Sequence, residues 1–119
     1  MAAPNIVNVA TITGKTAVAN VTTTATDIVN NAAASNKVLK INTLMVSNIN
    51  ATASANLTAS VFRSSIEYRV AANMVVPAGS TLMVITKDTA TYLEEGDSVR
   101  ITATANSILQ AVSSYEEIS

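Results

Sequence analysis

The chain has 119 residues, a length that is enough for one domain with its own hydrophobic core. Its net charge is −1. It contains no cysteine and no histidine, which excludes disulfides, thiol catalysis, cysteinyl metal sites and a histidine general base. No basic run is present, so the phosphate-neutralising surface of a nucleic-acid-binding protein is missing. Charged residues make up only 13% of the chain, and a surface poor in charge loses little solvation when it meets another protein.

The N-terminal region alternates apolar and polar residues with a period of two. Residues 5–12 and 16–22 flank Gly14-Lys15, a pattern that predicts strand, turn, strand. The first residues lack the positive region and the apolar run of a secretory signal. Residues 1–24 are the least charged and least core-like part of the chain. We therefore expect an N-terminal arm or edge strands there that pair with a neighbouring molecule.

The middle of the chain predicts several strands separated by polar loops. Residues 27–37 contain a short apolar pair followed by an Asn/Ser/Ala loop too short to sustain a helix. Residues 37–49 carry apolar side chains at both odd and even positions, which predicts a central strand covered on both faces for part of its length. After a loop at 50–56, residues 56–63 and 67–76 predict a β-hairpin that turns at Ser64-Ser65. The uncharged run 41–62 holds several asparagines, so we do not expect a membrane span.

The C-terminal part predicts a turn at residues 77–80 and an apolar strand at 81–86. A further turn at 87–89 leads to the stretch YLEEGDSVRITATANS, and residues 107–118 form the last expected strand. About eight short strands with regular turn signals indicate an all-β protein with an antiparallel β-sandwich, jelly-roll-like. The expected sandwich domain covers residues 25–119, and the extended N-terminal arm covers 1–24.

A carboxylate cluster around Gly96 is the strongest candidate for a chemical site. Val99, Ile101 and Ala103 share one face of the following strand, so the cluster lies at a turn. The simplest interpretation is a solvated hairpin turn, with Gly96 at positive φ and Asp97 capping a backbone amide. A calcium site would need further oxygen ligands besides Glu94, Asp97 and Asp88.

Catalysis at this cluster is disfavoured, because a glycosidase pair needs one carboxylic acid in an apolar pocket and a second across a sugar-sized gap. Serine and threonine nucleophiles have no histidine to activate them. We therefore expect no enzyme activity and assign no catalytic, cofactor-binding or metal residue. Two weaker candidates are an ion pair between Glu67 and Arg69 on one strand face, and sugar stacking on Tyr68 and Tyr115.

The segment VPAGSTLMVITKDTATYLEEGDSVRITATANSILQAVSSYEEIS resembles the C-terminal half of small virion structural proteins of tailed bacteriophages, especially marine and cyanobacterial phages. The start, MAAPNIVNV followed by TGKTAVANVT, is similar to the same group. The shared features are strand and turn residues rather than a catalytic signature.

The resemblance implies a non-enzymatic β-sandwich subunit of the virion, assembled in the host cytoplasm. Its place would be the head, as a capsid decoration or cement protein bound to the major capsid protein, or the neck or tail. We expect other virion proteins as partners and a homo-oligomer, with a trimer favoured, and no nucleic acid, membrane or cofactor. The alternative is a carbohydrate-binding adhesion module on the virion, for which Tyr68 and Tyr92 would be the residues to test.

Overall fold

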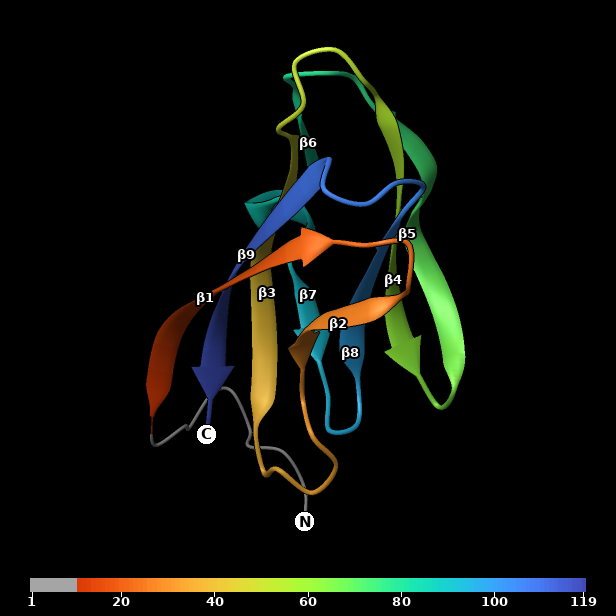
Figure 1. Cartoon of the computed structure of the whole chain (residues 1–119). Helices are drawn as coiled ribbons and strands as arrows, with labels where there is room; N and C mark the ends of the chain where they lie inside the picture. Colours follow the sequence, from red (N-terminus) through yellow and green to blue (C-terminus); the bar gives the residue numbers. More distant parts are fainter. Residues whose placement is uncertain (1–10) are drawn as a thin grey trace.

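The computed structural model describes residues 11–119 and consists of two packed antiparallel β-sheets (Figure 1). This confirms the predicted all-β sandwich. The first sheet has the strand order β1-β9-β3-β6, with β7 also paired to β3, and the second has the order β2-β8-β4-β5. The strands are β1 (Ile12–Val21), β2 (Thr26–Asn30), β3 (Val38–Asn48), β4 (Ala55–Arg63), β5 (Ile66–Val76), β6 (Thr81–Ile85), β7 (Thr91–Leu93), β8 (Ser98–Ala103) and β9 (Leu109–Ile118).

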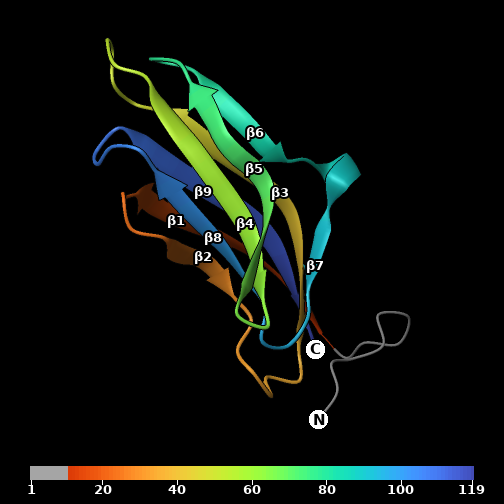
Figure 2. The ribbon, with the colours of Figure 1, turned by 90° about the vertical axis from the view of Figure 1, so that its right-hand side faces the viewer.

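The strand pairs are nested around the β4–β5 connection. β4 pairs with β5, β3 with β6, β2 with β8, and β1 with β9, so the chain forms a long hairpin rolled into two sheets. This nesting is the jelly-roll arrangement that the turn spacing predicts. The short β7 continues the path of β6 along β3, and the 3-10 helix η1 (Lys87–Thr89) projects between them (Figure 2).

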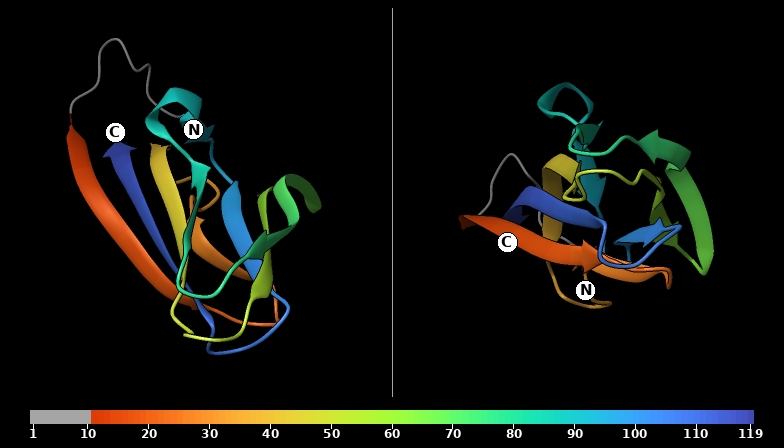
Figure 3. Two further views of the ribbon diagram at one scale, coloured as in Figure 1. Left: turned by 90° about the horizontal axis from the view of Figure 1, so that it is seen from above. Right: turned by 45° about the horizontal axis from the view of Figure 1, so that its top comes forward.

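The N-terminal prediction of a turn at Gly14-Lys15 is wrong. Both residues lie inside the single strand β1, which pairs with β9 over ten consecutive residues (Figure 3). Gly14 does not have a positive φ, so its backbone conformation is ordinary for a strand. Val21, at the end of β1, is fully buried in the core. The strand expected at 5–12 and the remainder of the predicted arm fall mostly on residues 1–10, outside the described residues.

Strand β3 is central, as predicted, but its apolar residues on both parities have a different cause. The register against β9 shifts between Ile41 and Thr43, which marks a β-bulge at Asn42. Leu39 and Ile41 point into the core before the bulge, and Leu44 and Val46 do so after it. One extra residue moves the inward side chains from odd to even positions. The bulge therefore keeps one face buried along the strand, and only at its start, where Val38 is also buried, are both faces covered.

The hairpin between β4 and β5 is confirmed at Ser64-Ser65, and both serines have positive φ, as a type I′ turn requires. The turn at 77–80 is also confirmed: the Ser80 amide donates to the Pro77 carbonyl at 3.1 Å, and Gly79 has φ +71°. The predicted alternation in β8 is confirmed as well. Its inward side chains join Leu57, Leu93 and Leu109 in the core between the sheets.

Candidate functional site

The carboxylate turn at residues 94–97 connects the two sheets, so it is not the hairpin turn that the sequence predicts. The strand before it, β7, pairs with β3 in the first sheet, and the strand after it, β8, pairs with β2 and β4 in the second. The Asp97 amide donates to the Glu94 carbonyl at 3.0 Å, and Gly96 has φ +89°. The Asp97 carboxylate accepts the Glu94 amide at 2.9 Å, which confirms its predicted capping role.

Asp97 is 2% exposed, so the expectation of a solvated turn is wrong for this residue. Its carboxylate accepts a bond from Arg63 Nε at 2.9 Å and a second bond from Arg63 Nη2. Arg63 Nη2 also donates to Glu94 at 2.9 Å. The bonded Asp97 carboxylate raises the pKa of the Arg63 guanidinium above its already high ordinary value. Arg63 therefore links the end of β4 to the turn between β7 and β8.

The loop between β2 and β3 completes the same end of the sandwich (Figure 1). The Gly96 amide donates to the Asn31 carbonyl at 2.8 Å, and the Asn31 amide donates to the Asp97 carbonyl at the same distance. The buried Asn31 side chain donates to the carbonyls of Lys37 and Leu93. These contacts join the β2–β3 loop to the β7–β8 turn, to which Arg63 also links the β4–β5 connection. Nothing in the sequence indicated the role of Asn31, because its partners in the β7–β8 turn lie far along the chain.

The carboxylates at this end are engaged in holding the turn rather than open to a ligand. Glu95 accepts the Asn36 amide at 2.9 Å, while Glu94 and Asp97 both contact Arg63. A depression of about 390 Å³ lies over the turn and is lined by Arg63, Ser64 and residues 94–97. Among residues 11–119, no group of three acidic or other metal-binding side chains is placed to hold an ion. Asp88 lies apart, in η1.

A second groove, of about 350 Å³, lies beside the first and shares Arg63 with it. It is lined by Val61 and Arg63 of β4, Tyr68 of β5, and Thr91 and Tyr92 of β7. The two tyrosines are exposed and come from different sheets. The sequence named both tyrosines as residues to test for sugar binding, and the nested strand order brings them to one surface.

The two weaker sequence candidates have different outcomes. Glu67 accepts the Ser60 hydroxyl at 3.0 Å, and the predicted Glu67–Arg69 ion pair is not among the ion pairs of the described chain. Tyr115 packs against the core from β9 and is not near Tyr68, so these two do not form a joint sugar platform.

Exposed apolar side chains concentrate on β5, the edge strand of the second sheet. Five of the ten large hydrophobic residues exposed in the described chain lie on it: Ile66, Tyr68, Val70, Met74 and Val75. We call these five residues the β5 patch. Met74 pairs with the buried Leu57 and its neighbour Val75 pairs with Asn56, so these two side chains lie on opposite faces, and the patch follows the sheet edge rather than one face. Exposed apolar side chains gathered along an edge strand are typical of interaction surfaces. Across residues 11–119, no helix has the length and apolar character needed to cross a membrane.

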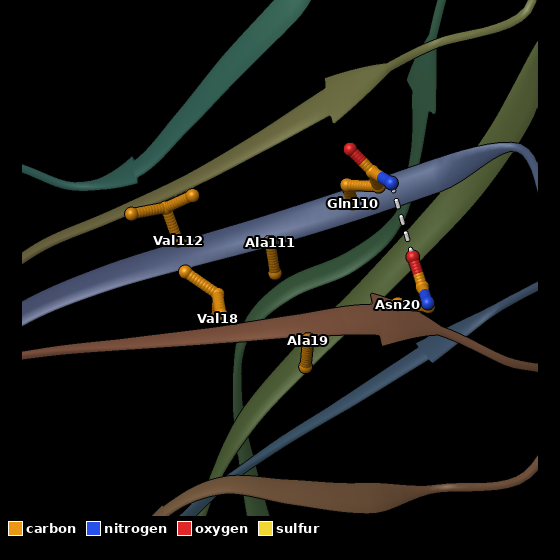
Figure 4. Close-up of a pocket in the computed structure, with 6 residues that line it drawn as sticks. All are labelled: Val18, Ala19, Asn20, Gln110, Ala111 and Val112. Carbon is orange, nitrogen blue, oxygen red and sulfur yellow. Dashed lines mark hydrogen bonds between the residues drawn. The ribbon is translucent and has the colours of Figure 1, made fainter.

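A third depression, of about 350 Å³, follows β1 and β9 at the opposite edge of the molecule (Figure 4). Val18 and Val112 project on the outer side of the sheet, and Ala19 and Ala111 on the other. The Gln110 side-chain amide donates to the Asn20 side-chain oxygen at 3.1 Å. The depression is shallow and offers small apolar side chains and backbone rather than a set of converging polar groups.

Comparison with known proteins gives a structural likeness and no sequence family. No family model matches the chain, and no curated protein matches it. A solved structure is similar in fold with a TM-score of 0.53 and 15% sequence identity, covering 92% of this chain and 88% of the other. It is described by the statement that Bacillus endospore appendages form a novel family of disulfide-linked pili. At this identity the likeness is one of fold alone.

Proposed function

We propose that this chain is a non-enzymatic structural protein of a tailed bacteriophage particle, and specifically a capsid decoration or cement subunit that stabilises the head lattice. The observation that carries the proposal is the β5 patch, an apolar surface on a sandwich whose carboxylates are committed to structural contacts. An apolar edge of this kind fits repeated contact with other protein subunits.

Two further observations support a structural role. The strand and turn pattern of residues 76–119 resembles small phage virion proteins, and the similar fold belongs to an appendage that is itself an assembly of protein subunits. Only 13% of the residues are charged, which lowers the desolvation cost of burying surface in a lattice. Weak contacts suffice in such assemblies, since binding at many symmetric positions adds through effective concentration.

The direct test is the presence and place of the chain on purified virions. Density-gradient particles analysed by quantitative mass spectrometry should contain many copies of the chain, and gold-labelled antibody should mark the heads. Label on the neck or tail would keep the structural role and reject decoration. Absence of the chain from washed particles would reject the proposed function.

A matched pair of substitutions tests whether the β5 patch makes the contact. Val75 and Ile49 are exposed to nearly the same extent, 57% and 55%, but only Val75 belongs to the patch. Val75→Glu should lower the number of copies per particle, whereas Ile49→Glu should leave it at the wild-type level. Equal occupancy for the two variants would show that the patch does not make the contact.

A carbohydrate-binding role is the second candidate, and the groove between Tyr68 and Tyr92 favours it. Exposed tyrosines can stack on sugar rings, and Arg63 can donate to hydroxyl groups. Glycan-array binding that disappears in Tyr68→Ala and Tyr92→Ala, and persists in a control such as Met83→Ala, would support this role. A wild-type protein that binds no glycan would reject it.

A further inference from the structure

The outer edge of β1 presents a regular row of unpaired backbone groups. The Thr11 amide donates to the Ser119 carbonyl and the Ser119 amide donates back to the Thr11 carbonyl, both at 2.9 Å. The register then continues without a shift from Ile12 opposite Ile118 to Val21 opposite Leu109. In an antiparallel ladder, bonded pairs alternate with non-bonded pairs. The odd residues of β1 therefore bond to β9, and the even residues direct their amides and carbonyls to the free edge.

This edge lacks the devices that normally block pairing with another strand. Within the described residues, β1 pairs with β9 alone, has no bulge and carries one charged residue, Lys15. The edge strand β5 differs, because its pairing with β4 contains two register shifts and Asn73 has a positive φ of 53°. Bulges and charges are the features that protect sheet edges from association. Of these two long edges, only β1 is suited to continuous strand pairing.

The outer face of β1 is complementary to itself in one antiparallel register. Val18 is the most exposed large hydrophobic residue in the described chain, at 73%, and Gly14 has nothing within 4 Å of the position that a Cβ would occupy. Thr16 lies midway between them. An antiparallel pair centred on Thr16 places each Val18 opposite the partner's Gly14 position. The Val18 side chain of each copy then covers the open space at Gly14 of the other, which gives two such contacts. The same register puts Lys15 opposite Ala17, which avoids a direct contact of like charges.

We propose that β1 is the contact between two copies of this chain, which pair antiparallel across a two-fold axis at Thr16 and join their first sheets into one. The even positions from Ile12 to Asn20 would exchange about ten backbone hydrogen bonds, two for each bonded pair. The inference rests on the proposed structural role, since it names a second copy as one partner. Only an isologous contact repeats the same pairing on both chains.

Single cysteines test the register, because the native chain contains none. In the full-length protein, Thr16→Cys should give a disulfide-linked dimer under mild oxidation, since bonded antiparallel partners have Cα atoms about 5.5 Å apart, within the range of disulfides. Val18→Cys alone and Gly14→Cys alone should not form disulfide-linked dimers, because each would be about 14 Å from its own copy. A mixture of these last two proteins should cross-link, because the register pairs one with the other. All three positions are exposed on the outer face, and thermal unfolding of each variant checks that it folds.

Cross-linking of Val18→Cys with itself in preference to Thr16→Cys would overturn the register and the complementarity of Val18 with Gly14. Equal cross-linking of all three single variants, or of none, would overturn specific pairing at β1. The same variants incorporated into particles separate this inference from the proposed function. Particles that contain the chain without any Thr16 cross-link would leave the structural role standing and reject the β1 contact.

Discussion

The contact between Arg63 and Asp97 should be a main determinant of stability at the end of the sandwich where the three connections meet. In Asp97→Ala the turn loses three hydrogen bonds to a buried carboxylate, one from the Glu94 amide and two from Arg63. Hydrogen bonds to charged groups contribute roughly 1.5–3 kcal/mol each. The arginine side chain is 45% exposed and regains water when its partner is removed, so its two bonds count for less. We therefore expect Asp97→Ala to lower the free energy of unfolding by about 3 kcal/mol, which is more than one typical hydrogen bond to a charged group contributes and less than three would.

Urea unfolding followed by circular dichroism measures this loss, provided that the slope with denaturant stays at the wild-type value. Glu94→Gln is the matched control, because Glu94 contacts the same Arg63 nitrogen but its side chain is 69% exposed. We expect the control to cost less than about 1 kcal/mol, as exposed ion pairs do. If Asp97→Ala is no more destabilising than Glu94→Gln, burial of the carboxylate does not give it the structural importance argued above.

Three further predictions concern the turns and the C-terminal strand. Ser65→Gly should stabilise the β4–β5 hairpin by about 1 kcal/mol, measured by urea unfolding, because glycine adopts the positive φ of the turn without strain; an unchanged midpoint would contradict this. Gly96→Ala should lower the melting temperature because of its φ of +89°, whereas Gly14→Ala, in strand conformation, should not, and equal effects would refute the assignment. A hydrogen bond from Lys37 lowers the pKa of Glu117, so the stability that this carboxylate adds is present above its ordinary pKa of 4.5 and lost as the pH falls through the lowered value. The melting temperatures of wild type and Glu117→Gln should therefore differ slightly at pH 7 and converge once the pH lies below the lowered pKa; a constant difference would exclude this contribution.

Local patterns predicted most strands but not the sheets to which they belong. The alternation of Val99, Ile101 and Ala103 is a local property, and the structure confirms it. The turn before it was also predicted, but a turn signal does not say whether the next strand pairs with the previous one. Here it crosses to the other sheet, because β8 pairs with β2 and β4. Asp97 is buried for the same reason, since the crossing places it between elements distant in the sequence.

Two predictions from local sequence missed features of the backbone, one in β3 and one in β1. Apolar residues at both parities of β3 predicted burial on two faces for part of the strand, but most of them are explained by a single extra residue at Asn42, which changes which parity points inward. Gly14 suggested a turn, yet the pairing partner of β1 is β9, at the far end of the chain. Glycine is tolerated in a strand when tertiary pairing supplies the stabilisation. Neither a bulge nor a partner more than ninety residues away leaves a local signal that sequence reasoning can use.

The nested pairing of the strands has a consequence for how the chain folds during synthesis. The β4–β5 hairpin closes through two residues, but Ile12 pairs with Ile118, so the first sheet lacks the strand beside β1 until residues 109–118 have been made. Long-range pairing of this kind is slow, and partly folded chains expose strand edges in the meantime. Until β9 has left the ribosome, β1 has no partner and both of its edges are open. Newly made chains should therefore depend on dilution or on chaperones until β9 emerges, and overexpression at low temperature should raise the soluble yield.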